Sequence, residues 1–151
     1  LPPRNLEMEL TETLLIESSD TIHIILESLR NLGVKLSIDD FGTGYSNLGY
    51  LKSFDVSVLK IDRSFVSKIL SSEHDRIIVE AILQVASQLN LKVVAEGVES
   101  KELADALLAL DCDMAQGYYW SEPLKAGDFE RFLRKSLPET ATGKSRYVRA
   151  T

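Results

Sequence analysis

Strand-like and helix-like segments alternate along this chain, and that alternation constrains its fold more than any other feature. Period-two apolar patterns predict strands at residues 6–10, 34–39, 56–61, 92–95 and 112–116. Helical patterns follow at residues 20–32, 72–89, 100–110 and 127–137, with a short helix ending near residue 54. Strands that alternate with helices pair in parallel. The pattern therefore predicts an α/β fold of about five parallel strands with flanking helices, either a (β/α) barrel or an open doubly wound sheet.

Several helices carry signals for their ends and their buried faces. Ser72 and Ser100 are placed to cap the starts of two helices, and Gly33 is placed to end the first. The expected inward stripes are Ile22, Ile25, Leu26, Leu29 and Leu32 in the first helix, and Ile77, Ile78, Ile82, Val85 and Leu89 in the long one.

Composition narrows the classes of function. A net charge of −6 argues against binding to long nucleic acids, whose phosphates need a basic surface. The two histidines, His23 and His74, lie apart and predict no zinc site. One cysteine, Cys112, fits a reducing, cytoplasmic compartment and a buried position.

No apolar run reaches the roughly 20 residues of a membrane span, so we expect no direct membrane contact from this segment. Residues 1–137 are expected to fold, and the polar residues 138–151 to form a tail.

Acidic side chains gather where the predicted strands end. They are Glu9, Asp39, Asp40, Asp62, Glu96 and Glu99, accompanied by Gln116. In (β/α) barrels the carboxyl ends of the strands form the active-site rim, so this placement favours the barrel. Strand parity agrees, because Glu9, Asp39 and Lys60 fall opposite the aliphatic residues of their own strands.

Crowded carboxylates repel one another, and a divalent cation such as Mg²⁺ or Mn²⁺ relieves that repulsion. Asp39 and Asp40 are adjacent at the end of a strand, so both can approach one site, with one of them bridging two ions. Lys60 can position water or neutralise phosphate charge. Acidic neighbours disfavour a Schiff-base role for it. Taken singly, Asp62 or Glu99 is explained better as a helix cap or helix-terminal charge, and it is the combination of several such positions with Lys60 that favours a site.

Five motifs, in order, resemble those of the EAL domain family. They are Leu6-Glu7-Met8-Glu9-Leu10-Thr11-Glu12, Asp39-Asp40-Phe41-Gly42-Thr43-Gly44-Tyr45-Ser46, Lys60-Ile61-Asp62-Arg63-Ser64-Phe65-Val66, Ala95-Glu96-Gly97-Val98-Glu99 and Gln116-Gly117-Tyr118-Tyr119-Trp120-Ser121-Glu122-Pro123-Leu124. The resemblance implies a TIM-like barrel and metal-dependent hydrolysis of cyclic di-GMP to linear pGpG. It implies metal ligation by Glu9, Asp39 and Asp40, and catalytic or supporting roles for Lys60, Glu96, Glu99 and Gln116.

The resemblance also implies a loop beside the metals that helps to form a dimer. Glu12 would anchor this loop, whose residues are Phe41, Gly42, Thr43, Gly44, Tyr45, Ser46 and Asn47.

One departure from the family is large. No Glu-Ala-Leu tripeptide occurs, and this strand and a second upstream motif each supply a metal ligand in the family. We therefore expect the C-terminal portion of an EAL domain, an incomplete barrel that binds metal weakly and turns over poorly alone. Its open edges predict a homodimer or pairing with missing N-terminal strands. A non-catalytic cyclic di-GMP binding or dimerisation module is the alternative. An unrelated barrel enzyme such as an aldolase would need a glycine-dense phosphate loop, which residues 116–124 lack.

Overall fold

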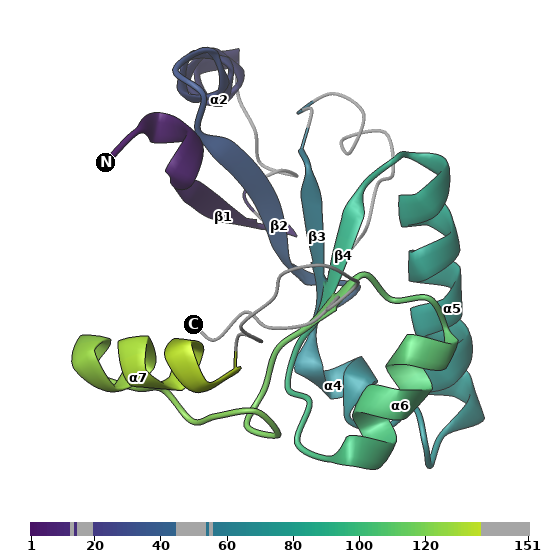
Figure 1. Ribbon diagram of the computed structural model, residues 1–151. Helices are drawn as coiled ribbons and strands as arrows, with labels where there is room; N and C mark the ends of the chain where they lie inside the picture. Colours follow the sequence, from purple (N-terminus) through teal and green to yellow (C-terminus); the bar gives the residue numbers. More distant parts are fainter. Residues whose placement is uncertain (13, 15–19, 45–53, 55, 137–151) are drawn as a thin grey trace.

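The computed structural model describes all residues except 13, 15–19, 45–53, 55 and 137–151 (Figure 1). After a 3₁₀ turn, η1 (Pro3–Asn5), the strands are β1 (Glu7–Thr11), β2 (Lys35–Phe41), β3 (Val58–Ile61), β4 (Lys92–Ala95) and β5 (Met114–Ala115). The helices are α2 (Asp20–Asn31), α4 (Arg63–Val66), α5 (Glu73–Gln88), α6 (Lys101–Ala109) and α7 (Ala126–Ser136). The expected short helix before residue 54 and the polar tail both lie outside the described residues.

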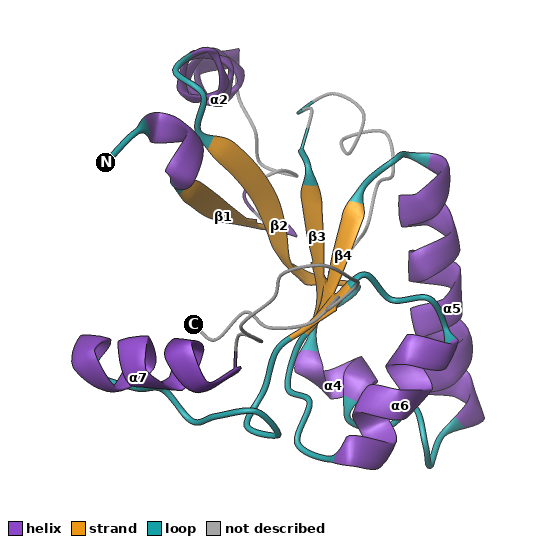
Figure 2. Cartoon of the chain, in the orientation of Figure 1, coloured by secondary structure: helices purple, strands orange, loops and turns teal. Residues whose placement is uncertain are grey.

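The strands form one parallel five-stranded sheet in the order β1-β2-β3-β4-β5. Figure 2 shows the first four strands side by side. Each strand therefore pairs with its neighbour in sequence. A doubly wound sheet reverses its strand order at a switch point, and this sheet has none among the described strands. The fold is α/β, with the strand succession of a barrel wall.

Burial explains why the central strands form. All four residues of β3 are buried, and the sheet's core includes Ile38, Leu59, Ile61 and Val93, each at most 1% exposed. Helix α5 contacts β3 and β4, and α2 contacts β2. The capping predictions are confirmed: the Ser72 and Ser100 hydroxyls each accept a backbone N–H at 3.2 Å, and Gly33 has φ +93°.

Some predicted boundaries and faces are wrong. Strand β2 continues to Phe41 instead of ending at residue 39, and β5 is reduced to two residues. In α5, Ile77 is 57% exposed, whereas Val79 and Ala86 are fully buried. Val79, Ile82 and Ala86 are spaced three and four residues apart and so share one face of the helix. The buried face of α5 is therefore rotated from the one that the sequence predicted.

The predicted stripe of α2 is also only partly correct. Leu26 is buried and Ile22 and Leu29 pack against the core, but Ile25 and Leu32 are 52% and 66% exposed. Within the described part of the chain, no helix has the length and apolarity to cross a membrane.

Candidate functional site

A buried lysine brings the carboxyl ends of four elements together. The Lys60 ammonium lies 2.8 Å from Glu9 Oε1, 2.9 Å from Asp39 Oδ1 and 2.8 Å from Glu96 Oε1. These three carboxylates come from β1, β2 and the residue after β4, whereas Lys60 itself is in β3 and only 6% exposed. The parity expectation that Glu9, Asp39 and Lys60 share a face is thus confirmed.

A bulge explains how two successive aspartates reach one site. Neighbouring residues of a regular strand point to opposite faces. Here Ile38 pairs with Leu59 and Phe41 with Ile61, so β2 holds an extra residue within this interval. Asp40 occupies the bulge with φ +54°, a conformation that is uncommon outside glycine but tolerated by Asp. The bulge, rather than an early end of the strand, turns Asp40 toward the site.

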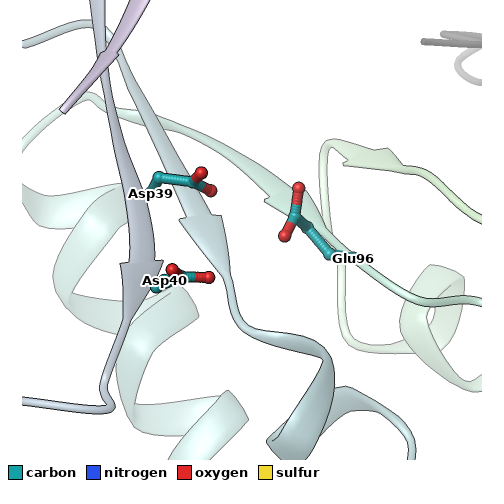
Figure 3. A group of neighbouring side chains, drawn as sticks. All are labelled: Asp39, Asp40 and Glu96. Carbon is teal, nitrogen blue, oxygen red and sulfur yellow. The ribbon is translucent and has the colours of Figure 1, made fainter. Parts of the chain in front are cut away.

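Asp39, Asp40 and Glu96 converge on a common point (Figure 3). Each offers a carboxylate oxygen, and the three oxygens lie within 4.8 Å of one another. Asp39 Oδ1 is buried and, among the described residues, has no donor in hydrogen-bond geometry even though Lys60 is close. Hard, all-oxygen ligands around an unsatisfied buried oxygen fit a divalent cation of the Mg²⁺ or Mn²⁺ type.

The ionisation of the site follows from this crowding. Burial, and then repulsion from Asp39 and Asp62, raises the pKa of Asp40. Burial also raises the pKa of Glu96, against the opposing hydrogen bond from Lys60. Burial alone would lower the pKa of Lys60, but its close contacts with the carboxylates of Glu9, Glu96 and Asp39 outweigh burial and raise that pKa above its usual range. A lysine held as ammonium is a poor Schiff-base nucleophile, which agrees with the sequence argument.

Asp62 combines two roles that the sequence argument treated as alternatives. Its Oδ1 accepts the Ser64 backbone N–H at 2.9 Å and so caps α4. Its side chain also interacts with that of Asp40. Parity with Lys60 was the available signal for the second role, because residues two apart on an extended segment point to the same side.

Glu12 lies behind the site and holds the following loop. It is 6% exposed, and its Oε2 accepts the backbone N–H groups of Gly42 at 3.2 Å and Gly44 at 3.3 Å. Thr43 hydrogen-bonds back to the Asp40 carbonyl oxygen through its hydroxyl at 2.9 Å, and Phe41 is buried. Tyr45, Ser46 and Asn47 of the same loop fall outside the described residues.

The remaining candidates stand at the margin of the cluster. Glu99 Oε1 pairs with Arg63 at 3.1 Å, and both side chains are more than half exposed. The Gln116 backbone donates to the Ala95 carbonyl at 2.8 Å and accepts from Val98 at 3.0 Å, which places residue 116 beside the turn after β4. Glu99 does not belong to the group of three converging carboxylates.

Comparison with known proteins agrees with this geometry. The sequence profile of the EAL domain family matches residues 1–123. The chain is 49% identical over 129 residues to the cyclic di-GMP phosphodiesterase NbdA of Pseudomonas aeruginosa, covering 85% of this chain and 16% of NbdA. It superposes on the PaMucR phosphodiesterase in a cyclic di-GMP complex with a TM-score of 0.81 and 43% identity, covering 85% of this chain and 52% of that one.

A third similar structure is Klebsiella pneumoniae BlrP1 in a manganese and cyclic di-GMP complex. It gives a TM-score of 0.75 at 37% identity and covers 81% of this chain and 31% of that one. The chain spans between 16% and 22% of the length of the curated relatives compared. The family match covers most of the chain and coincides with the strand-end cluster, so this chain belongs to the EAL domain family.

Proposed function

We propose that this chain carries, at the carboxyl ends of its strands, part of an active site that hydrolyses cyclic di-GMP to linear pGpG with the help of divalent cations. The observation that carries the proposal is the ion-pair cluster of Lys60 with Glu9, Asp39 and Glu96, beside Asp40. Support comes from similar proteins that are named as cyclic di-GMP phosphodiesterases and from similar structures described as complexes with that nucleotide. The intact carboxylates favour hydrolysis over a purely binding or dimerising module.

Asp39, Asp40 and Glu96 would hold the cations, with Glu9 as a further ligand released from Lys60. Mg²⁺ and Mn²⁺ are the proposed ions, because the ligands are all carboxylate oxygens. Such ions, when bound, lower the pKa of water and neutralise charge on a phosphodiester. The absence of a Glu-Ala-Leu segment in these 151 residues removes one ligand that the family resemblance implies, so we expect slow turnover by this chain alone.

The protein's own groups divide the remaining work. Lys60 would place a positive charge beside the bound phosphodiester. Because Lys60 is buried, water screens this charge less and its attraction for the phosphate is stronger. Glu96 would act beside the second cation, either as a ligand or as the general base, and for the second role burial raises its pKa and hence its basicity. It would accept the proton of the attacking water while the phosphorus–oxygen bond to the ribose breaks. Glu99 and Gln116 would support the turn that presents Glu96.

Dimerisation is the finer part of the proposal. β1 and β5 are the outer strands of the described sheet, so each has an edge that can pair with a second copy or with complementary strands. Glu12 would keep the loop beginning at Phe41 in the shape that the dimer uses. Light scattering should show self-association that rises with concentration, and a monomer at all concentrations would refute this part.

Replacement of the best-placed ligand tests the activity. We expect slow, Mn²⁺-dependent formation of pGpG by chromatography, suppressed by chelator and abolished by Asp39→Asn, which keeps the shape but weakens metal ligation. Asp105→Asn is the matched control, because Asp105 is an exposed aspartate paired only with Lys101 among the described ion pairs. Activity of Asp39→Asn close to that of the control would overturn the assignment.

A further inference from the structure

The turn that presents Glu96 is built on a glycine covered by an arginine. Gly97 has φ +68°, a left-handed conformation that favours glycine. A Cβ added to Gly97 would lie 2.7 Å from Arg63 Cβ and 2.8 Å from Arg63 Cδ, and closer still to Arg63 Cγ. The aliphatic part of Arg63 therefore occupies the space that any other residue at position 97 would need.

Backbone bonds hold the turn on its other sides. The Glu96 N–H donates to the Ile61 carbonyl at 3.1 Å, and the Val98 N–H donates to the Gln116 carbonyl at 3.0 Å. Gly117 also approaches the Val98 backbone so closely that a Cβ there would overlap it. Between these backbone bonds, the side chain of Arg63 packs against the Gly97 side of the turn.

The guanidinium extends the contact to the end of the turn, where it pairs with Glu99 Oε1 at 3.1 Å. Both partners are more than half exposed, so water and salt screen this ion pair and it contributes little. The packing of the aliphatic stem on Gly97 is then the larger part of the contact, as is common for long charged side chains.

Arg63 also begins α4, directly after Asp62, whose side chain interacts with Asp40. The start of α4 thus interacts with Asp40 of β2 through Asp62 and with the Glu96–Glu99 turn through Arg63. We propose that Arg63 is a positioning residue that clamps the turn after β4 through Gly97, and so holds Glu96 at the distance from Asp39 and Asp40 that cation binding requires. This inference rests on the proposed function.

Two substitutions separate the contribution of the Arg63 stem from that of its charge, and a third at another arginine is the control. Arg63→Ala removes stem and charge, Arg63→Met keeps the stem, and Arg76→Ala is a control at an exposed arginine that pairs with Glu80 on α5. Calorimetry would give the Mn²⁺ dissociation constant, and thermal unfolding without metal would give the melting temperature. Loss of groups that orient metal ligands weakens affinity by about 10- to 100-fold, so we expect about tenfold for Arg63→Ala. Arg63→Met should stay within about twofold of the unchanged chain, because it keeps the packing.

The readouts distinguish positioning from simple stabilisation. A clamp predicts weaker Mn²⁺ binding at a melting temperature like that of Arg76→Ala, together with faster amide exchange at Val98. Unchanged Mn²⁺ affinity in Arg63→Ala overturns the inference while leaving the proposed function intact, and Arg63→Met as weak as Arg63→Ala overturns the assignment to the stem. If the unchanged chain does not bind Mn²⁺, the proposed function fails, and the clamp fails with it.

Discussion

The two halves of the sheet differ in how well their helices cover them. In the half formed by β3, β4 and β5, helices α5 and α6 bury Val79, Ile82, Ala86, Leu103 and Leu107. In the half formed by β1 and β2, helix α2 buries Leu26 alone, and Ile24 and Ile25 are 64% and 52% exposed. Among the described residues, the same β/α pattern therefore packs several fully buried helix side chains on one half and only Leu26 on the other.

The candidate site is assembled across that divide. Glu9 and Asp39 come from the β1–β2 half, and Lys60 and Glu96 from the well-covered half of β3, β4 and β5. Lys60 is the residue that joins them. Because β3 is fully buried, it fixes the position of the Lys60 ammonium, and we infer that the ammonium orders the carboxylates of the β1–β2 half.

The largest effect is expected from removal of this link. Lys60→Met should lower turnover by about 100- to 1,000-fold, the usual cost of deleting an electrostatic stabiliser. In metal-free protein it should also lower the free energy of unfolding by about 1–3 kcal/mol, because the partly buried Asp39 and Glu96 carboxylates lose their ammonium partner. Lys92→Met is the control, since Lys92 is 66% exposed in its pair with Asp113 and should cost less than about 1 kcal/mol. Urea unfolding measures the loss of unfolding free energy in both variants. Equal losses in Lys60→Met and Lys92→Met would contradict the role of Lys60 as the link between the two halves.

Core truncation compares the halves directly. Leu107→Ala, at a residue 1% exposed in α6, should cost about 2–5 kcal/mol of unfolding free energy. Ile25→Ala, at the half-exposed face of α2, should cost less than about 0.5 kcal/mol. Urea denaturation of both variants gives the two values. A similar cost at both positions would mean that α2 is covered in solution, for example by a second copy, and would break the comparison.

The smallest effect concerns the Cys112 thiol, whose rate of alkylation reports how readily the half of the sheet formed by β3, β4 and β5 opens. Burial raises the pKa of the Cys112 thiol to about 11. Since the folded state favours the neutral thiol, its stabilising contribution is complete below about pH 9 and is lost as pH rises toward 11. At pH 8, alkylation should be at least about tenfold slower in folded than in urea-unfolded protein. Equal rates would show that this half opens freely.

Much of the fold could be predicted because its signals are local. The caps Ser72 and Ser100 satisfy the first turns of α5 and α6 through bonds within three residues, and β4 falls at the predicted residues. Helix faces were harder to predict. Ile77 and Ile25 are apolar at positions compatible with a buried stripe, but the packing surface that decides the face comes from distant strands.

Strand parity predicted part of the site, whereas the approach of Asp40 was predicted from an early end of the strand and is in fact produced by a bulge. Alternation places Glu9, Asp39 and Lys60 on one face, and the structure joins them. The same alternation would send Asp40 to the other face. The bulge that returns it depends on the pairing of Phe41 with Ile61 across to β3, which is a long-range contact. The second role of Asp62 depends on the same displacement of Asp40.

Saturable Mn²⁺ binding by the metal-free chain tests the central claim most directly, because the claim is that Asp39, Asp40 and Glu96 form a cation site beside Lys60. Calorimetric titration of the unchanged chain, Asp39→Asn and Asp105→Asn isolates these ligands from the rest of the acidic surface. We predict weak saturable binding by the unchanged chain and by Asp105→Asn, and loss of saturation in Asp39→Asn. Identical titrations for all three proteins would contradict the claim.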